Sequence, residues 1–239
     1  MLLSIILPSY KASSALKNQL PDFIQFLESK KIEYEIIVVD DGSDDDEKTK
    51  EVALSLNCTF LTNGKNMGKG AAVRNGMLHA KGKFRIFTDA DIPFEYDAME
   101  EFLHYLKNKE FDLVIGDRTL PESNYFDNIS KSRKMGSAVF SFIVGRFITT
   151  GMFDTQCGIK GFSAKVADDI FSVSKINSFA FDVEVIYIAL KRNYDIKRLP
   201  VKLRNSEDSS VSLLKHSIGM VVDIMKIKWN HLRGKYIKK

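Results

Sequence analysis

The stretch EIIVVDDGS, residues 35–43, decides the fold, because four β-branched residues run without interruption into two acids and a glycine. A strand with one face in water alternates apolar and polar residues, whereas a strand buried on both faces is continuously apolar. Residues 35–39 therefore predict a strand inside a parallel sheet that is covered on both faces. Asp40, Asp41 and Gly42 follow where this strand is expected to end.

Strand-like and helical patterns alternate on both sides of this stretch. We expect further strands over residues 2–7, 58–61, 83–88 and 112–115, and helices over residues 15–29, 45–56, 70–80 and 96–107. This alternation predicts the α/β class, with a mostly parallel, Rossmann-like central sheet flanked by helices on both faces. Such sheets bind ligands outside the carboxyl ends of their strands, so functional residues are expected directly after the strands.

The second half of the chain is less regular. Its expected elements are a strand at residues 158–163, a helix to about residue 171, a helix over residues 180–192, a strand over residues 195–204 and an amphipathic helix from about residue 213. Pro200 makes residues 195–204 an edge strand, because proline cannot donate a hydrogen bond to a neighbouring strand. We interpret residues 1–211 as one domain and residues 212–239 as a basic amphipathic helix and tail.

Composition and charge limit where the protein is expected to work. The chain has 239 residues, 44% of them hydrophobic, and a net charge of +4, and residues 226–239 hold six Lys or Arg and no acid. Residues 135–153 are strongly apolar but contain Arg146, and no stretch reaches the roughly 20 apolar residues of a membrane span. The N-terminus lacks the basic region of a signal peptide. Cys58 and Cys157 form no metal or disulfide pattern, which favours a reduced, cytoplasmic setting.

Two acids one residue apart, Asp89 and Asp91, follow the apolar run at residues 83–87. Alternate side chains of a strand point the same way, so these carboxylates are expected to project together and to need a positive partner. Mg²⁺ or Mn²⁺ suits them, because such ions take one or two carboxylates together with substrate phosphates. A solvated acidic loop is the alternative. Carboxyl groups that diverge, or a lysine of the same chain seated on them, would contradict a metal at this pair.

Other expected strands also end in charged residues or glycine. Asp40 is a candidate hydrogen-bond acceptor for a nucleotide base, whereas the acids at residues 44–46 suit a helix N-terminus. Gly68 and Gly70 enter a helix whose free N–H groups favour an anion, and Lys69 adds positive charge. Their spacing matches neither a P-loop nor a dinucleotide fingerprint. A plain glycine turn with solvated charges is the alternative.

Seven motifs in this order resemble the inverting family 2 glycosyltransferases with the GT-A fold. They are PSY, VVDDGS, GKGAAVRNG, DAD, GDR, DTQCGIKGF and FAFDVEVIYIA, and the match runs from about residue 4 to residue 204. The pattern is most similar to the dolichyl-phosphate β-glucosyltransferase branch, with the polyprenyl-phosphate mannose synthases next. The resemblance implies a nucleotide-diphosphate sugar donor of the UDP-glucose or GDP-mannose type, Mg²⁺ or Mn²⁺ at the DXD motif, and a lipid phosphate acceptor.

The resemblance also implies roles for individual residues. Those implied to bind the nucleotide sugar are Pro8, Tyr10, Asp40, Lys69, Asp89, Ala90, Asp91, Arg118 and Arg204. The first three would hold the nucleoside, Asp89 and Asp91 the metal on the diphosphate, and Arg118 a donor phosphate or the sugar. Lys69 or Arg204 would offset further charge. Asp154 matches an acidic position near the acceptor and Asp182 another in the active site, so the implied catalytic residues are Asp91, Asp154 and Asp182.

Two segments depart from the family pattern. Residues 9–14 read SYKASS where relatives read SYNE or a similar sequence, so an amide and a carboxylate expected near the nucleoside are missing. Residues 205–215 lack the usual serine–lysine pair after the edge strand, and Arg204 and Lys215 are the candidate substitutes.

The predicted reaction is a metal-dependent, inverting transfer of a hexose to polyprenyl (dolichyl or undecaprenyl) phosphate, as in cell-envelope glycan biosynthesis. A phosphate monoester has a second pKa of about 6 and is already ionised, so Asp154 or Asp182 would orient it, whereas a sugar hydroxyl would need a base. Residues 135–153, Trp229 and the basic tail favour peripheral association with an anionic membrane surface, and no nucleic-acid partner is expected.

Three other functions compete with this prediction. One is a glycosyltransferase that acts on a glycan hydroxyl. Another is a sugar-phosphate nucleotidyltransferase, which needs a glycine- and arginine-rich loop after the first strand, where this chain has PSYKASS. The third is a non-catalytic nucleotide-sugar binding protein.

Overall fold

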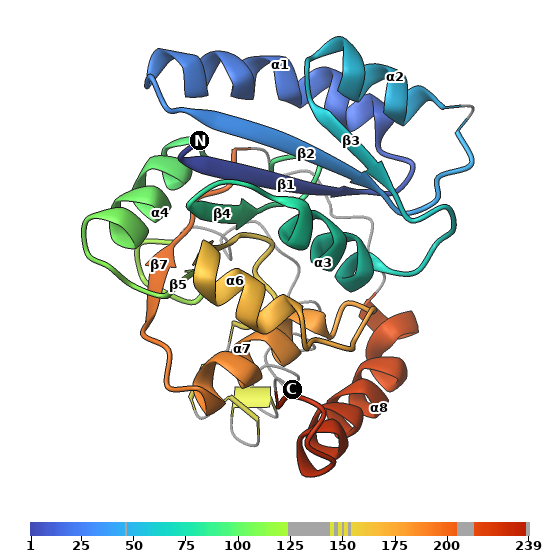
Figure 1. The fold of residues 1–239 in the computed structure, drawn as a ribbon, viewed down its shortest axis with the longest axis vertical. Coiled ribbons are helices and arrows are strands. Elements are labelled where there is room, and N and C mark those ends of the chain that lie inside the picture. Colours follow the sequence, from blue (N-terminus) through green and yellow to red (C-terminus); the bar gives the residue numbers. More distant parts are fainter. Residues whose placement is uncertain are drawn as a thin grey trace.

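The computed structural model describes residues 1–45, 47–123, 144–145, 148–149, 151–152, 154–204 and 213–237 (Figure 1). Its strands are β1 (Leu3–Ser9), β2 (Tyr34–Asp40), β3 (Thr59–Thr62), β4 (Phe84–Phe87), β5 (Leu113–Asp117), β6 (Lys160–Ser163) and β7 (Ile196–Pro200). Its helices are α1 (Ser13–Ser29), α2 (Lys48–Ser55), α3 (Lys69–His79), α4 (Asp97–Lys107), α6 (Ala164–Phe171), α7 (Phe181–Lys191) and α8 (Leu213–Leu232).

The described strands form one mostly parallel sheet, as predicted, in the order β3-β2-β1-β4-β6-β5-β7. β1 pairs in parallel with β2 and β4, β2 with β3, and β5 with β7. β6 runs antiparallel to both of its neighbours, β4 and β5. β7 lies at the edge of the sheet, as Pro200 predicts. The sequence pattern therefore predicts the strands and this edge, but it does not predict the direction of β6.

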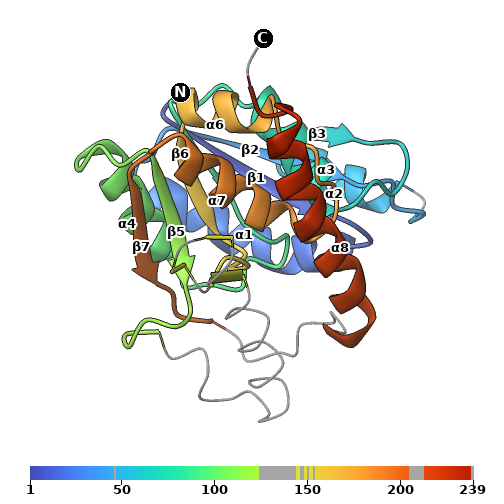
Figure 2. The ribbon, with the colours of Figure 1, turned by 90° about the horizontal axis from the view of Figure 1, so that it is seen from below.

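Both faces of the sheet are buried, which explains the uninterrupted apolar run in β2. Ile36 and Val38 belong to a core with α1, α2 and α4, and Ile37 and Val39 belong to a core with α3, α6 and α7. Figures 1 and 2 show these two groups of helices on opposite sides of the sheet. Because alternate residues of a strand point to opposite faces, no position from Ile36 to Val39 is left for a polar residue.

Helix α2 begins later than expected, at Lys48 instead of residue 45. Glu47 adopts a left-handed backbone with φ of 62°. Asp45 accepts the backbone N–H of Thr49 at 3.2 Å, so its carboxylate serves the N-terminus of α2, in line with the role expected for the acids of this turn.

Helix α8 packs beside α7 (Figure 2) and buries Met220, Ile224 and Ile227. Among the described residues, no helix is both long and apolar enough to cross a bilayer. Most of the apolar stretch at residues 135–153 and the expected boundary between residues 211 and 212 lie outside the described residues.

Candidate functional site

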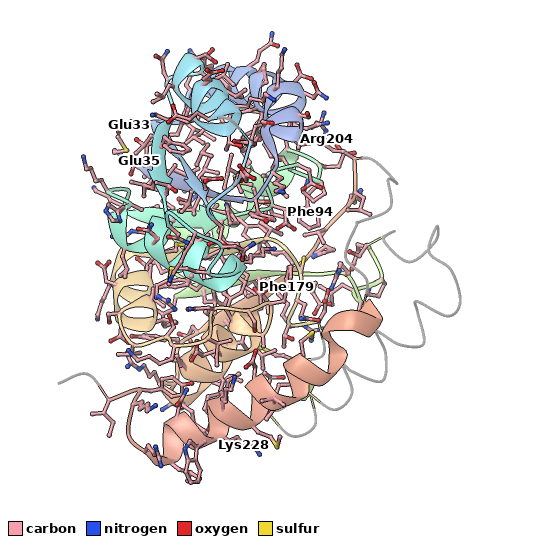
Figure 3. All side chains as sticks on the ribbon, turned by 90° about the vertical axis from the view of Figure 1, so that its right-hand side faces the viewer. Glu33, Glu35, Phe94, Phe179, Arg204 and Lys228 are labelled. Carbon is pink, nitrogen blue, oxygen red and sulfur yellow. The ribbon has the colours of Figure 1, made fainter. Side chains whose placement is uncertain are left out.

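The candidate site lies at the carboxyl ends of β1, β2 and β4, the rim of the sheet that the sequence predicts. These strands point to the right in Figure 1, so Figure 3 looks onto their carboxyl ends. In the sheet register Ser9, the last residue of β1, lies beside Asp40, the last residue of β2. Thr88 directly follows β4.

Three buried side chains at this rim have a polar atom without a hydrogen-bond partner among the described residues: Ser9 Oγ, Asp40 Oδ1 and Thr88 Oγ1. The other oxygen of Asp40 accepts the backbone N–H groups of Gly42 and Ser43 at 3.1 and 3.0 Å. A buried polar atom without a partner costs free energy, so such atoms gather where a ligand supplies the missing hydrogen bonds. This arrangement fits Asp40 as the acceptor for a nucleotide base.

Pro8 and Tyr10 lie on either side of Ser9. Pro8 pairs with Val39 inside the sheet, and the Tyr10 side chain is 48% exposed at the rim. The backbone N–H of Lys11 donates to Ser43 Oγ at 2.7 Å, which ties the segment after β1 to the segment after β2. An exposed aromatic ring close to an unpartnered acceptor offers a surface on which a base can stack.

The glycines at the start of α3 pack against another segment and do not leave N–H groups free for an anion. The Gly68 N–H donates to Asp41 Oδ2 at 2.7 Å, and the Gly70 N–H donates to Asn177 O at 2.7 Å. A Cβ on Gly68 would lie 2.4 Å from Asn177 O. The sequence-based expectation of an anion on these N–H groups is therefore wrong, and the glycines are needed for close packing.

Lys69, the first residue of α3, reaches the acids that follow β4. Its Nζ forms an ion pair with Asp89 Oδ1. The Ile92 N–H donates to Asp89 O at 2.9 Å, so the two acids lie in a turn after β4. The expectation that strand alternation aims both carboxylates the same way therefore does not apply to them. Burial lowers the pKa of Lys69, but the carboxylates of Asp89 and Asp182 outweigh it and raise that pKa, which keeps the ammonium charged.

Asp91 is the exposed acid of the pair. Desolvation by neighbouring atoms and the negative charge of Asp89 both raise the pKa of the Asp91 carboxyl, so the two carboxylates are close enough to repel. A Cβ on Gly158 would lie 2.3 Å from Asp89 Oδ2, so glycine at this position leaves room for that carboxylate. A lysine on the pair is the observation expected to contradict a metal, and Lys69 is seated on Asp89. The described ion pair does not include Asp91, although the Lys69 charge opposes the rise in the pKa of Asp91.

The acid pair fits a divalent ion that also binds phosphate. In the parts of the chain that the structure describes, no group of three or more His, Cys, Asp and Glu side chains could hold a metal by itself. Mg²⁺ commonly takes one or two carboxylates and completes its shell with waters and substrate phosphates. The repulsion between Asp89 and Asp91 would be relieved by such an ion, which would replace the Lys69 ammonium on Asp89.

Asp182 lies in the first turn of α7 and is held in a buried ion pair. Its carboxylate contacts Nζ of Lys160, whose side chain is 0% exposed. Lys160 also donates to Cys157 O at 2.7 Å. Burial raises the pKa of the Asp182 carboxyl above its ordinary value, although the Lys160 and Lys69 ammonium groups act in the opposite direction. The structure therefore brings Asp182 next to Lys69 but keeps it covered.

Arg118 and Asp154 form a two-pronged pair beyond β5. Arg118 Nε donates to Asp154 Oδ2 at 2.9 Å, and a terminal nitrogen of Arg118 donates to Oδ1 at 2.6 Å. Burial alone would raise the pKa of the Asp154 carboxyl, but the Arg118 charge and its hydrogen bonds lower the pKa below its ordinary value. Asp154 is therefore a weak base in this arrangement.

Arg204 lies at the rim, but its guanidinium faces Tyr96 and Gln19 and not the acid pair. Its backbone N–H donates to Pro93 O at 2.9 Å, two residues after Asp91. Its guanidinium lies 3.7 Å from the centroid of the Tyr96 ring and donates to Gln19 Oε1 at 3.3 Å. Figure 3 labels Arg204 at the edge of this side of the molecule. The structure does not bring its charge onto the acid pair.

Three residues support the site although the sequence analysis assigns them no role. Lys160 could have been identified, because a lysine inside the apolar run GIKGF requires an acidic partner when buried. Asp41 accepts the N–H groups of Met67 and Gly68 and so shapes the turn before α3. Asn177 holds Gly70 through its backbone carbonyl, which leaves no signal in the residue type, and accepts from Arg74 through its side chain.

Comparison with known families and proteins places this geometry among sugar-transferring proteins. The family model described as "Glycosyl transferase family 2" matches residues 4–171. The chain is 34% identical to the dolichyl-phosphate beta-glucosyltransferase of Dictyostelium discoideum, over 97% of this chain and 75% of that protein.

Solved structures share the fold at low sequence identity. The mannosyl-3-phosphoglycerate synthase of Rubrobacter xylanophilus superposes with a TM-score of 0.72 at 17% identity, over 98% of this chain and 75% of that one. The glucosyl-3-phosphoglycerate synthase of Mycobacterium tuberculosis, in complex with Mg²⁺ and uridine diphosphate, gives a TM-score of 0.68 at 14% identity, over 95% of this chain and 77% of that one.

Replacement of Lys160 tests the buried pair. We expect Lys160→Met to lower the free energy of unfolding by about 3–5 kcal/mol, because it leaves the Asp182 charge buried without its partner. Lys160→Met combined with Asp182→Leu should recover most of the loss. Lys30→Met removes an exposed ion pair with Glu100 and should leave the urea unfolding midpoint nearly unchanged. Equal losses for Lys160→Met and Lys30→Met would contradict this role.

Proposed function

The chain belongs to glycosyl transferase family 2, and we propose that within this family it transfers glucose from UDP-glucose to a polyprenyl phosphate at a membrane surface. It is a hexosyltransferase with the GT-A fold. The observation that carries the finer proposal is the near-full-length similarity to a dolichyl-phosphate beta-glucosyltransferase. Donor, acceptor, metal and membrane are each supported by features of the rim.

The nucleoside is assigned to the ends of β1 and β2. Asp40 Oδ1 accepts a base N–H, since it is buried without a partner, and the exposed Tyr10 ring covers the base beside Pro8. The diphosphate extends from there towards Asp89 and Asp91. Lys69 moves from Asp89 onto a phosphate oxygen. The ammonium then pairs with the phosphate, and Asp89 would pair with the divalent ion.

Asp89 and Asp91, on either side of Ala90, would hold a Mg²⁺ or Mn²⁺ ion. When bound, the ion supplies a Lewis acid for the departing nucleoside diphosphate. A structural neighbour of the same fold contains Mg²⁺ and uridine diphosphate, which supports both the ion and the nucleotide. Arg118 holds Asp154 through two hydrogen bonds from its guanidinium and one from its backbone N–H, so we assign this pair to orienting the sugar and the acceptor and not to the metal.

The state of the candidate bases favours a phosphate acceptor over a glycan hydroxyl. A hydroxyl nucleophile needs a carboxylate that can take a proton. Arg118 lowers the pKa of Asp154. Burial raises the pKa of Asp182, but its carboxylate is covered and paired with Lys160, so neither acid is free for that task. A phosphate monoester with a second pKa of about 6 needs no such base. Asp154 and Asp182 therefore act by orientation.

The outer face of α8 supports a location at an anionic lipid surface. Val222, Met225, Trp229 and Leu232 are exposed on it at helical spacing, with Trp229 55% and Leu232 79% exposed. The basic residues Lys226, Lys228, Arg233 and Lys235 are also exposed, and Arg233 lies 4.6 Å from the Trp229 ring centroid. We call Val222, Met225, Trp229 and Leu232 the outer stripe of α8. An apolar stripe with flanking cations is typical of helices that lie in the interface of acidic bilayers.

A donor and acceptor screen tests the transfer. We expect UDP-glucose, polyprenyl phosphate and Mn²⁺ or Mg²⁺ to give a hexosyl lipid phosphate detectable by mass spectrometry, and a chelator to stop it. Asp91→Asn should lower the rate by at least about 100-fold, since it removes a ligand of the ion that stabilises the leaving group. Asp97→Asn, an exposed acid in α4, is the matched control and should retain activity. Transfer to a glycan hydroxyl, or full activity of Asp91→Asn, would overturn the proposal.

Vesicle binding tests the membrane surface separately. The full chain should co-sediment with vesicles that contain phosphatidylserine and bind pure phosphatidylcholine weakly, with binding reduced by salt. Met225→Ser, Trp229→Ser and Leu232→Ser together should weaken binding at least about tenfold, because they remove the apolar stripe. Leu54→Ser with Leu78→Ser, two exposed leucines on other helices, is the control. Equal binding by both variants would exclude the outer stripe as the docking face.

A further inference from the structure

One short segment lies between the donor turn and the C-terminal helix. We call residues 175–180, which join α6 to α7, the bridging segment. Its residues contact the start of α3 on one side and α8 on the other. Figure 3 labels Phe179 of this segment, on the side of the molecule where α3 and α8 both lie.

The contact with α3 is closely packed and hydrogen-bonded. Asn177 O accepts the Gly70 N–H at 2.7 Å, and Asn177 Oδ1 accepts a guanidinium nitrogen of Arg74 at 2.6 Å. A Cβ on Gly70 would lie 2.6 Å from Ile176 O, and one on Gly68 2.4 Å from Asn177 O. The bridging segment therefore cannot move towards α3 without displacing the turn that holds Lys69.

A polar link joins this segment to α8. Ser178 Oγ donates to Asp223 Oδ2 at 2.6 Å. Ser178 Oγ also accepts the N–H of Ala180 at 3.1 Å, so its hydroxyl is fixed as donor to α8 and acceptor from its own segment. Asp223 pairs through its other oxygen with Lys226 at 2.7 Å on the surface of α8.

A second link comes from the turn after α8. Tyr236 OH donates to Glu184 Oε1 at 2.7 Å. Glu184 is 0% exposed and accepts the N–H of Lys175 at 2.9 Å and the N–H of Ile176 at 2.8 Å. Without the tyrosine hydroxyl, this buried carboxylate would hold the same two N–H groups with one donor fewer.

We infer that Asp223 and Tyr236 are positioning residues for the donor site, because they hold the bridging segment against the glycine turn that aims Lys69 at Asp89. The inference rests on the proposed donor site, since it assigns a purpose to the position of Lys69. It does not require the membrane proposal. Its consequence is that the C-terminal element takes part in sugar-nucleotide binding although none of its described side chains contacts Asp89 or Lys69.

Amide hydrogen exchange of the full chain, measured by NMR without any substrate, tests directly whether Asp223 and Tyr236 hold the bridging segment against the glycine turn. Asp223→Ala and Tyr236→Phe should each increase the exchange rate of the Gly70 N–H by about fivefold, the change that corresponds to one weakened hydrogen bond. Asp223→Asn keeps an acceptor for Ser178 and should stay near the wild-type rate. Lys226→Ala removes the surface partner of Asp223 without touching the bridging segment and is the matched control.

Kinetics add a readout that general destabilisation would not give. With UDP-glucose and a short-chain polyprenyl phosphate, Asp223→Ala and Tyr236→Phe should raise the KM for UDP-glucose several-fold and leave the KM for the lipid phosphate unchanged. Asp223→Asn should restore the wild-type KM.

The two proposals can fail separately. If the Gly70 exchange rate is the same in wild type, Asp223→Ala and Tyr236→Phe, the positioning inference is overturned. If Asp223→Ala raises the amide exchange rates along the whole of α8, the Gly70 exchange rate in Tyr236→Phe decides whether the positioning inference stands. If the exchange rates change as expected but the wild type transfers no sugar, the proposed function fails while the link between α8 and the glycine turn stands.

Discussion

The compensation of negative charge at one rim of the sheet is the constraint on which the candidate site depends. Parallel strands bring their carboxyl ends together, and acids follow several of them in this chain. Acids this close need cations within contact distance. The structure supplies them from helices, strands and loops that are distant in sequence: the pairs are Lys69–Asp89, Lys160–Asp182, Arg118–Asp154 and Arg198–Asp117. Each pair fixes one part of the site relative to another.

These pairs are not equivalent. Asp182 and Asp154 are 5% exposed and their cations are largely covered, so breaking either pair would leave a buried charge. Asp89 is 37% exposed and adjoins Asp91, whose carboxyl is outside the described ion pair. Compensation is thus incomplete at the acid pair, and a divalent ion with a diphosphate would complete it. The proposed chemistry falls at an acid pair whose negative charge the described cations offset only in part.

The sequence predicted the parts of the fold that depend on periodicity. The run IIVV indicated a doubly covered strand, and the alternation of elements indicated the parallel sheet. The antiparallel direction of β6 was not predictable, because the apolar pattern of a strand is the same whichever way the strand runs. The motif order also located the acid pair. The glycine turn was misinterpreted because a glycine that avoids Asn177 O and one that binds an anion look alike in sequence.

The exchange of a lysine for a divalent ion on Asp89 is the central claim, and Mn²⁺ binding measured by electron paramagnetic resonance tests it most directly. In the absence of nucleotide, Lys69→Met should bind Mn²⁺ more tightly than the wild type, because the ammonium no longer competes for Asp89 Oδ1. Addition of UDP should reduce the difference in Mn²⁺ affinity between Lys69→Met and the wild type, because the wild-type lysine can then pair with a phosphate. Identical or weaker Mn²⁺ binding by Lys69→Met without nucleotide would contradict the claim.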